Sequence, residues 1–261
     1  MNWMPFPHPS DAFVYDAASL RAHWARLHAG DCEPFPVKPA LVEAWIAFHA
    51  GDFYRAMKLG LAQGVCGYAV AHKATCVYAS EVEEDLARKL ALFDVVAERC
   101  ERHQREEPDN PAAWYWQAFA LGRTAQTISI VKALAKGLAP KVRHGLKHAI
   151  ALAPDHADAW IGLGVYQSEI VGATGPLIAS MTYGARKEDC HAACDTLDEH
   201  LRHVRARLAE LQALEADLMA LRSRCDGSDA QCHIIEALHQ RADAQSSAPI
   251  APGPAAGKRH V

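Results

Sequence analysis

The chain has 261 residues, of which 50% are hydrophobic and 22% are charged. These values are typical of one or two globular domains rather than a disordered chain. The formal net charge of −4 argues against a general nucleic-acid-binding protein. The first residues, MNWMPFPHPSDAF, do not resemble a signal peptide, and no apolar run reaches the ~18 residues of a membrane span. We therefore expect a cytoplasmic protein without a membrane partner, with its eight cysteines reduced.

Helical periodicity covers most of the chain, and segments with the alternation of a half-buried strand are hard to find. We therefore predict an all-α fold. Segment 41–64 reads as two helices joined by a turn at Gly51-Asp52, with the small Ala56 where the two helices cross closely. The other helices predicted in the first half cover about residues 17–29, 65–81 and 84–106.

A repeat pattern follows in the middle of the chain. Aromatic, apolar and small residues fall on tetratricopeptide (TPR) positions, namely Trp114, Ala118, Leu121, Ala149, Pro154, Trp160, Leu163 and Gly164. The two tryptophans are 46 residues apart, whereas a standard repeat has about 34 residues, so roughly twelve are inserted. The insertion lies within 124–140. A second insertion follows Gly172. Its apolar part, 176–183, could line a ligand groove, but we favour the interpretation that it caps the end of the repeat core.

Three segments carry a resemblance to bacterial TPR proteins related to the TatT-like partners of TRAP transporters. They are NPAAWYWQAFALGR (110–123), LAPDHADAWIGLGVY (152–166) and TYGARK (182–187). The resemblance covers about residues 1–187. It implies that this part is a TPR-like array of helical hairpins, and it is compatible with a protein partner bound by that array.

The stretch from Cys190 to Cys232 has a different pattern. Residues 196–224 contain neither Gly nor Pro, and apolar residues recur at steps of four and three. They are Leu197, Leu201, Val204, Leu208, Leu211, Leu214, Leu218 and Leu221. This is the seam of one long coiled-coil helix.

Three cysteines flank this seam. Cys190 and Cys225 are 35 positions apart, so one continuous helix holds them roughly 50 Å apart. Thiolates that share a metal ion must each lie about 2.3 Å from it. An antiparallel two-chain coiled coil brings Cys190 of one chain to Cys225 and Cys232 of the other. The spacing therefore predicts a homodimer with two three-thiolate sites for a soft or borderline divalent metal ion.

Residues 188–241 resemble the dimerisation half of the cadmium-, lead- and zinc-responsive MerR-family transcription regulators. Cys190, the LDEHLRHVRARLAEL run, Cys225 and Cys232 carry the resemblance. It implies an antiparallel dimer, a Cd, Pb or Zn ion held by these three thiolates, and a role in metal-responsive transcription. By the same resemblance His200, His203 and His260 would form a second metal site. Nothing in residues 1–189 reads like the winged helix-turn-helix of that family, which puts DNA binding in doubt.

Other residues admit a structural and a functional interpretation. Cys194 is either a fourth thiolate or a seam residue, and we favour the seam. The pair His144 and His148 has no third ligand nearby in sequence, so we expect a helix surface there. The basic cluster could meet an acidic partner, but we favour a solvated helix face for Lys132, Lys136, Lys141, Arg143 and Lys147. We expect the scattered cysteines to be buried as small hydrophobes, namely Cys32, Cys66, Cys76 and Cys100.

The sequence thus predicts a TPR-like domain (1–187), a MerR-type dimerisation helix with a metal-binding loop (188–241) and a disordered tail (242–261). The leading hypothesis is a dimeric heavy-metal-binding protein with a TPR scaffold. The alternative is a TPR scaffold for a protein partner, dimerised by its C-terminal helix. Glycine-rich phosphate loops and GxSxG or HExxH motifs are absent, so we do not expect an enzyme.

Overall fold

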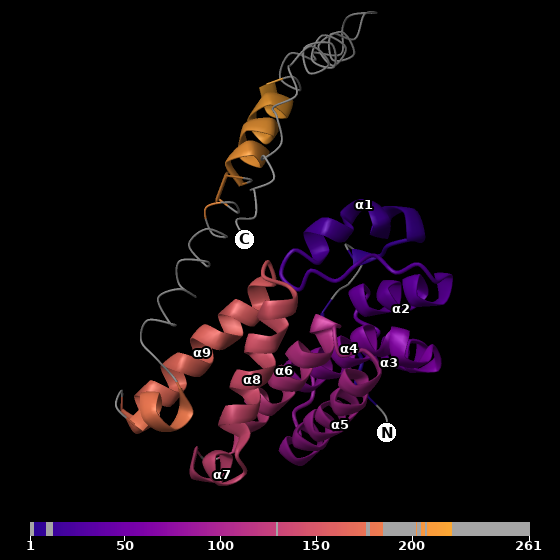
Figure 1. The fold of residues 1–261 in the computed structure, drawn as a ribbon. Helices are drawn as coiled ribbons and strands as arrows, with labels where there is room; N and C mark the ends of the chain where they lie inside the picture. Colours follow the sequence, from indigo (N-terminus) through magenta and orange to yellow (C-terminus); the bar gives the residue numbers. More distant parts are fainter. Residues whose placement is uncertain are drawn as a thin grey trace, which may run out of the picture. The chain divides into compact units, whose positions relative to one another are not determined.

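A computed structural model of the chain describes residues 3–8, 13–128, 130–175, 178–184, 202, 205–206 and 208–220 (Figure 1). None of these residues lies in a strand, so the all-α prediction is confirmed for the described part of the chain. No helix in these segments is both long and apolar enough to cross a membrane. The chain divides into two compact units, Met1–His200 and Leu201–Val261.

The described residues of the first unit form nine α-helices, most of which pack on their neighbours in the chain (Figure 1). In chain order these are α1 (Ala17–Leu27), α2 (Pro39–His49), α3 (Phe53–Ala62), α4 (Tyr68–Glu81), α5 (Leu86–Glu106), α6 (Pro111–Thr127), α7 (Ile130–Ala135), α8 (Leu138–Leu152) and α9 (Ala157–Thr174). A 3-10 helix (Gly64–Gly67) precedes α4, and a π-helix (Ala179–Tyr183) follows α9.

Polar side chains at the N-caps explain where several of these helices begin. Asp16, Asp52 and Asp85 each accept a hydrogen bond from the backbone N–H three residues later. Asn110 caps α6 in a similar way, with a proline at the first helical position. Each such cap stabilises a helix by about 1 kcal/mol. The predicted turn at Gly51-Asp52 is therefore confirmed, and Gly51 adopts the positive φ of 81° that this turn requires.

The turns before α6 and α9 repeat the same hydrogen bond at an interval of 46 residues. The indole N–H of Trp114 donates to the carbonyl of Pro108 (2.7 Å), and that of Trp160 donates to the carbonyl of Pro154 (2.9 Å). In both turns the side chain four positions before the tryptophan caps the helix. The two turns are thus structurally equivalent, with the same offset that the sequence pattern shows.

Helices α6 and α8 approach closely because glycine occupies the contact. A Cβ atom at Gly145 would lie 2.9 Å from the carbonyl oxygen of Trp114 and 3.0 Å from the Cβ of Ala118. Ala118 is itself only 2% exposed. This close crossing brings the apolar face of α8, with Val142 and Leu146, beneath the space between α6 and α9.

The loop after α1 contacts the first turn of α9. The backbone N–H of Asp158 donates to the carbonyl of Gly30 at 3.0 Å. Gly30 is also in contact with the Asp158 side chain, since a Cβ there would lie 2.6 Å from Oδ1. The loop after α1 therefore links the first and last helices of this unit.

Both predicted insertions contain short helices. Helix α7 lies in the first insertion, and α8 begins after Gly137, which has a φ of 63°. In the second insertion Ala179 is fully buried, and the backbone carbonyl of Tyr183 accepts a hydrogen bond from the Tyr166 hydroxyl (3.1 Å). The described part of this segment thus packs on α9, although Met181 remains 79% exposed.

In the second unit residues 208–220 are helical. Four seam residues lie on this helix with exposed fractions from 44% to 52%, namely Leu208, Leu211, Leu214 and Leu218. An apolar stripe of this kind on a helix is the face that a coiled coil buries.

Candidate functional site

The predicted metal ligands lie outside the described residues. This applies to Cys190, Cys225 and Cys232, to the second set His200, His203 and His260, and to Cys194. Among the residues that the structure describes, no group of three or more His, Cys, Asp or Glu side chains is arranged to hold a metal ion. The three-thiolate site therefore stays a prediction from the sequence.

The burial prediction for the other cysteines was half wrong. Cys76 and Cys100 are fully buried, on α4 and α5. Cys32 and Cys66 are exposed, because Cys32 lies in the loop after α1 and Cys66 lies in the 3-10 helix Gly64–Gly67 rather than on the buried face of an α-helix. The Cys66 thiol donates to the carbonyl of Gln63 and accepts a hydrogen bond from the Lys38 ammonium, both at 3.1 Å.

The histidines of α8 pack against an aromatic ring. The ring centroids of His144 and His148 lie 5.6 Å and 4.0 Å from that of Trp114. In the basic cluster the described lysines are exposed, in accord with the favoured helix-face interpretation, and Arg143 is half-buried.

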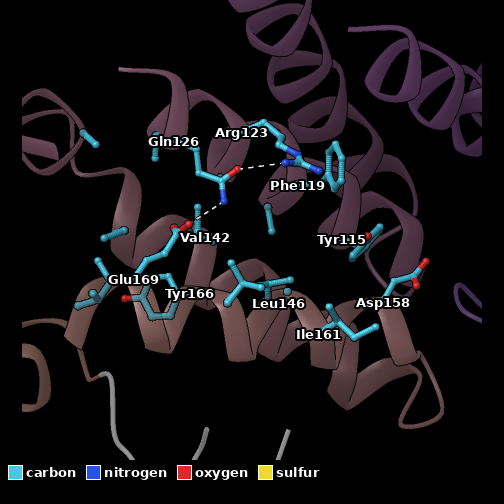
Figure 2. A pocket seen from close by; sticks show the side chains of 18 residues that line it. Tyr115, Phe119, Arg123, Gln126, Val142, Leu146, Asp158, Ile161, Tyr166 and Glu169 are labelled. Carbon is cyan, nitrogen blue, oxygen red and sulfur yellow. Dashed lines mark hydrogen bonds between the residues drawn. The ribbon is translucent and has the colours of Figure 1, made fainter. Parts of the chain in front are cut away.

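The clearest candidate site is a pocket of about 390 Å³ between α6 and α9, which we call the α6/α9 pocket (Figure 2). Its volume lies within the ~300–1,000 Å³ usual for ligand sites. Most of its lining is apolar and comes from α6, α8 and α9, with Ala133 from α7. The apolar side chains include Ala118, Phe119, Ala125, Val142, Leu146, Ile161, Val165 and Ile170.

Two small residues keep this pocket open. A Cβ at Gly122 of α6 would meet only one described atom within 4 Å, the Cγ1 of Val142 at 4.0 Å. Gly162 of α9 faces Leu146, whose Cδ2 would lie 3.0 Å from an added Cβ. A larger side chain at position 122 would therefore fill the space between the helices. A larger side chain at position 162 would instead require Leu146 of α8 to shift.

Polar side chains line one side of the pocket. Arg123 donates from Nη1 to the Oε1 of Gln126 at 3.3 Å, and Gln126 donates from Nε2 to the Oε1 of Glu169 at 2.8 Å (Figure 2). The guanidinium of Arg123 also lies over the ring of Phe119, 5.1 Å from its centroid. The pocket thus combines an apolar interior with a hydrogen-bonded polar edge that joins α6 to α9.

Tyrosines at the pocket are kept neutral. Burial raises the pKa of Tyr166 to about 12, and its hydroxyl is already engaged with the Tyr183 carbonyl. Burial, aided by the charge of Asp158, raises the pKa of Tyr115 well above its usual value. Neither phenol is therefore prepared to act as a base at neutral pH.

A second group of polar residues, buried or half-buried, lies where the loop after α1 meets α2 and α4. The Nδ1 of His28 lies 2.9 Å from the Oδ1 of Asp31, and its Nε2 lies 3.2 Å from the Nε2 of His49. The Lys73 ammonium donates to the other oxygen of Asp31 at 2.5 Å. Because the Nδ1–H of His28 donates to the Asp31 carboxylate, the Nε2 of neutral His28 accepts from His49, and the four groups form one hydrogen-bonded network.

The pKa values in and beside this hydrogen-bonded network follow from burial and from pairing. Burial would raise the pKa of Asp31, but the hydrogen bond from His28 and the charge of Lys73 outweigh it and hold the carboxyl well below its usual value. Burial lowers the pKa of His28 and brings that of His49 down to about 4. Burial and the charge of Asp31 raise the pKa of the neighbouring Glu33 to about 8.

A third group lies between α4 and α5. His72 and His103 are fully buried, with ring centroids 5.4 Å apart. Neither ring nitrogen of His72 has a hydrogen-bond partner in the described part of the chain. Burial and the positive charge of Arg99 lower its pKa far below 6.5. This pair is thus neutral and packs as part of the core.

Sequence reasoning did not single out the polar edge of the α6/α9 pocket. The helix pattern predicted α6 and α9, but Arg123, Gln126 and Glu169 look like ordinary exposed helix residues. The only signal was the glycine at 122, in a helix interior where glycine costs about 1 kcal/mol relative to alanine.

Comparison with known proteins adds no further assignment. A scan against protein-family models gave no match, and neither did searches of the curated proteins and of the solved structures.

Proposed function

We propose that this chain is a non-enzymatic binding protein with a TPR-like body, and that the α6/α9 pocket is its ligand site. Support for the TPR-like body comes from the turns before α6 and α9, which repeat the same indole-to-carbonyl bond 46 residues apart. Successive helices also pack on one another along the chain, as they do in helical repeats.

One observation carries the choice of site. The α6/α9 pocket is a 390 Å³ space with apolar walls and a few convergent polar groups, the combination that ligand sites favour. The hydrogen-bonded network around Asp31 is an alternative centre, but its polar groups already form hydrogen bonds with one another. It therefore reads as a structural link between α1, α2 and α4.

Filling the pocket tests this proposal. We expect the full-length chain to enhance the fluorescence of Nile red, a neutral apolar dye, and Gly122→Leu to remove most of that signal. The substitution should leave the fold intact, because leucine has a higher helix propensity than glycine by about 0.8 kcal/mol. Gly172→Leu is the matched control, since it changes a glycine of α9 that has open space around it and lies outside the pocket.

Equal dye signals from the wild type and Gly122→Leu, with similar melting temperatures, would contradict the proposal. Loss of the signal in both glycine variants would also count against it, because the effect would then not depend on the pocket.

We further propose that the C-terminal segment dimerises the chain and binds a soft divalent metal ion through Cys190, Cys225 and Cys232. The support is the spacing of the three thiols around an unbroken seam, together with the half-exposed leucines of residues 208–220. Three thiolates suit Cd, Pb or Zn, and binding to the folded dimer would stabilise it by mass action. Any role in metal-responsive transcription rests on the resemblance alone.

Cadmium loading tests this second proposal. After removal of unbound metal we expect the wild type to retain cadmium and to have the mass of a dimer by light scattering. Cys225→Ser should retain markedly less, whereas Cys66→Ser, which changes an exposed cysteine of the first unit, should load like the wild type. Equal cadmium content in the wild type and Cys225→Ser would sink the idea.

A further inference from the structure

Two opposite charges at the edge of the α6/α9 pocket have no charged partner among the residues that the structure describes. Within the described residues the guanidinium of Arg123 makes one hydrogen bond, to the amide of Gln126, and no ion pair. The carboxylate of Glu169 likewise accepts from Gln126 and has no cation within salt-bridge distance in the described part of the chain. A ligand that carries both charges could satisfy Arg123 and Glu169 at once.

Gln126 fixes the arrangement of these two groups. Its Oε1 accepts from Arg123 and its Nε2 donates to Glu169, so the amide can point only one way (Figure 2). The guanidinium is also held over the ring of Phe119. The amide therefore lies between the cation and the anion and bonds to both.

The apolar interior of the pocket lies beside this edge. Val142 and Leu146 of α8 and Ile161 of α9 line it (Figure 2), as does Val165 of α9. Ile161 and Val165 are 39% and 43% exposed, so an apolar group seated here would cover them. Such burial is worth about 25 cal/mol per Å² of apolar surface.

The remaining charged group of the lining lies at the other end. Asp158 precedes Glu169 by eleven positions on α9, which separates their backbones by roughly 16 Å. Figure 2 shows the two carboxylates at opposite ends of the pocket. Asp158 also packs on Gly30 and is therefore not a second acid beside Arg123.

We propose that the α6/α9 pocket binds a free α-amino acid with a large apolar side chain. The α-carboxylate pairs with Arg123, the α-ammonium pairs with Glu169, and the side chain enters the apolar interior. This inference rests on the proposed function and specifies its ligand. A fatty acid would leave Glu169 without a partner, and an amine would leave Arg123 without one. A residue inside a peptide carries neither charge on its main chain.

Three related compounds separate the two charge contacts in titration calorimetry of the full-length chain. They are L-phenylalanine, hydrocinnamate, which lacks the ammonium, and phenethylamine, which lacks the carboxylate. We expect the wild type to bind phenylalanine roughly tenfold more tightly than either analogue, since a hydrogen bond to a charged group contributes about that much.

The variants should lose this preference in a crossed pattern. Glu169→Gln should bind phenylalanine and hydrocinnamate equally well, because glutamine still accepts from Gln126 but carries no charge. Arg123→Gln should bind phenylalanine and phenethylamine equally well. A merely structural role of either residue would weaken all three compounds together. Gly122→Leu should abolish binding, and Gly172→Leu should not.

Several results would overturn the assignment. They are wild-type affinities that are equal for phenylalanine and hydrocinnamate, a parallel loss of all three compounds in either charge variant, and tighter binding of an amphipathic peptide than of phenylalanine. If phenylalanine fails to bind while Nile red still enters and Gly122→Leu still excludes it, the ligand class is wrong and the binding function stands. Failure of the Nile red experiment would instead remove the proposed function itself.

Discussion

Buried histidines are the most unusual residues of the first unit. Burial lowers the pKa values of four buried histidines, His28, His72, His103 and His156, and of the half-buried His49. An imidazole whose pKa is lowered in the folded state takes up its proton first in the unfolded state. These residues therefore link the stability of the fold to pH.

We predict that the chain loses stability as the pH falls from about 6.5, the ordinary histidine pKa, toward 4, the value of His49. Glu33 acts in the opposite direction, because its raised pKa makes its contribution disappear as the pH rises from 4.5 toward 8. Below pH 6.5 the five histidines together destabilise the fold more than Glu33 stabilises it. The melting temperature should fall by roughly 5 °C or more between pH 6.5 and 4.5.

The variant His72→Phe provides the control for this predicted loss of stability at low pH. Because neither nitrogen of His72 has a hydrogen-bond partner in the described residues, the apolar ring should preserve stability at pH 7. It should also make the loss at low pH shallower. A melting temperature that stays constant from pH 7 to 4.5 would contradict the linkage.

The sequence was informative about buried residues and poor for polar ones. Of the TPR positions, Ala118, Leu121, Ala149 and Leu163 are buried, because spacing along a helix determines which side chains share a face. The hydrogen-bonded row of Arg123, Gln126 and Glu169 could not be predicted, since it joins helices that are 46 positions apart in sequence. Its partners meet only after α6 and α9 have packed on α8.

At the scale of helices, glycine determines how closely α6 and α8 pack. Gly145 has no room for a Cβ atom, and its close contact with Trp114 and Ala118 positions the floor of the α6/α9 pocket. Helix periodicity predicts such helices well. It does not predict their ends to the residue, as segment 65–81 shows. That segment begins with a 3-10 turn, and α4 starts only at Tyr68.

We predict that Gly145→Leu destabilises the fold by about 1–3 kcal/mol, the usual cost of overpacking a core. Denaturant unfolding followed by circular dichroism measures this change. Gly172→Ala, also within a helix but surrounded by open space, should instead be neutral or stabilising by up to about 1 kcal/mol. If the two substitutions have equal effects, the close crossing of α6 and α8 does not limit packing in the way proposed.

At the scale of the whole molecule, the two units carry different kinds of information. The first unit has a packed core and a pocket whose lining residues are all described. The second unit carries a leucine stripe, whereas the proposed metal ligands Cys190, Cys225 and Cys232 are known from sequence spacing alone. The binding proposal therefore rests on geometry, whereas the metal proposal rests on the positions of three cysteines.

The location of ligand binding tests the central claim most directly. In amide NMR spectra of the labelled full-length chain, added L-phenylalanine should shift resonances from residues 118–126 of α6 and 161–170 of α9. The same titration of Gly122→Leu should leave these resonances in place. Shifts confined to the region of His28, Asp31 and Lys73, or no shifts at millimolar phenylalanine, would contradict the assignment of the α6/α9 pocket as the ligand site.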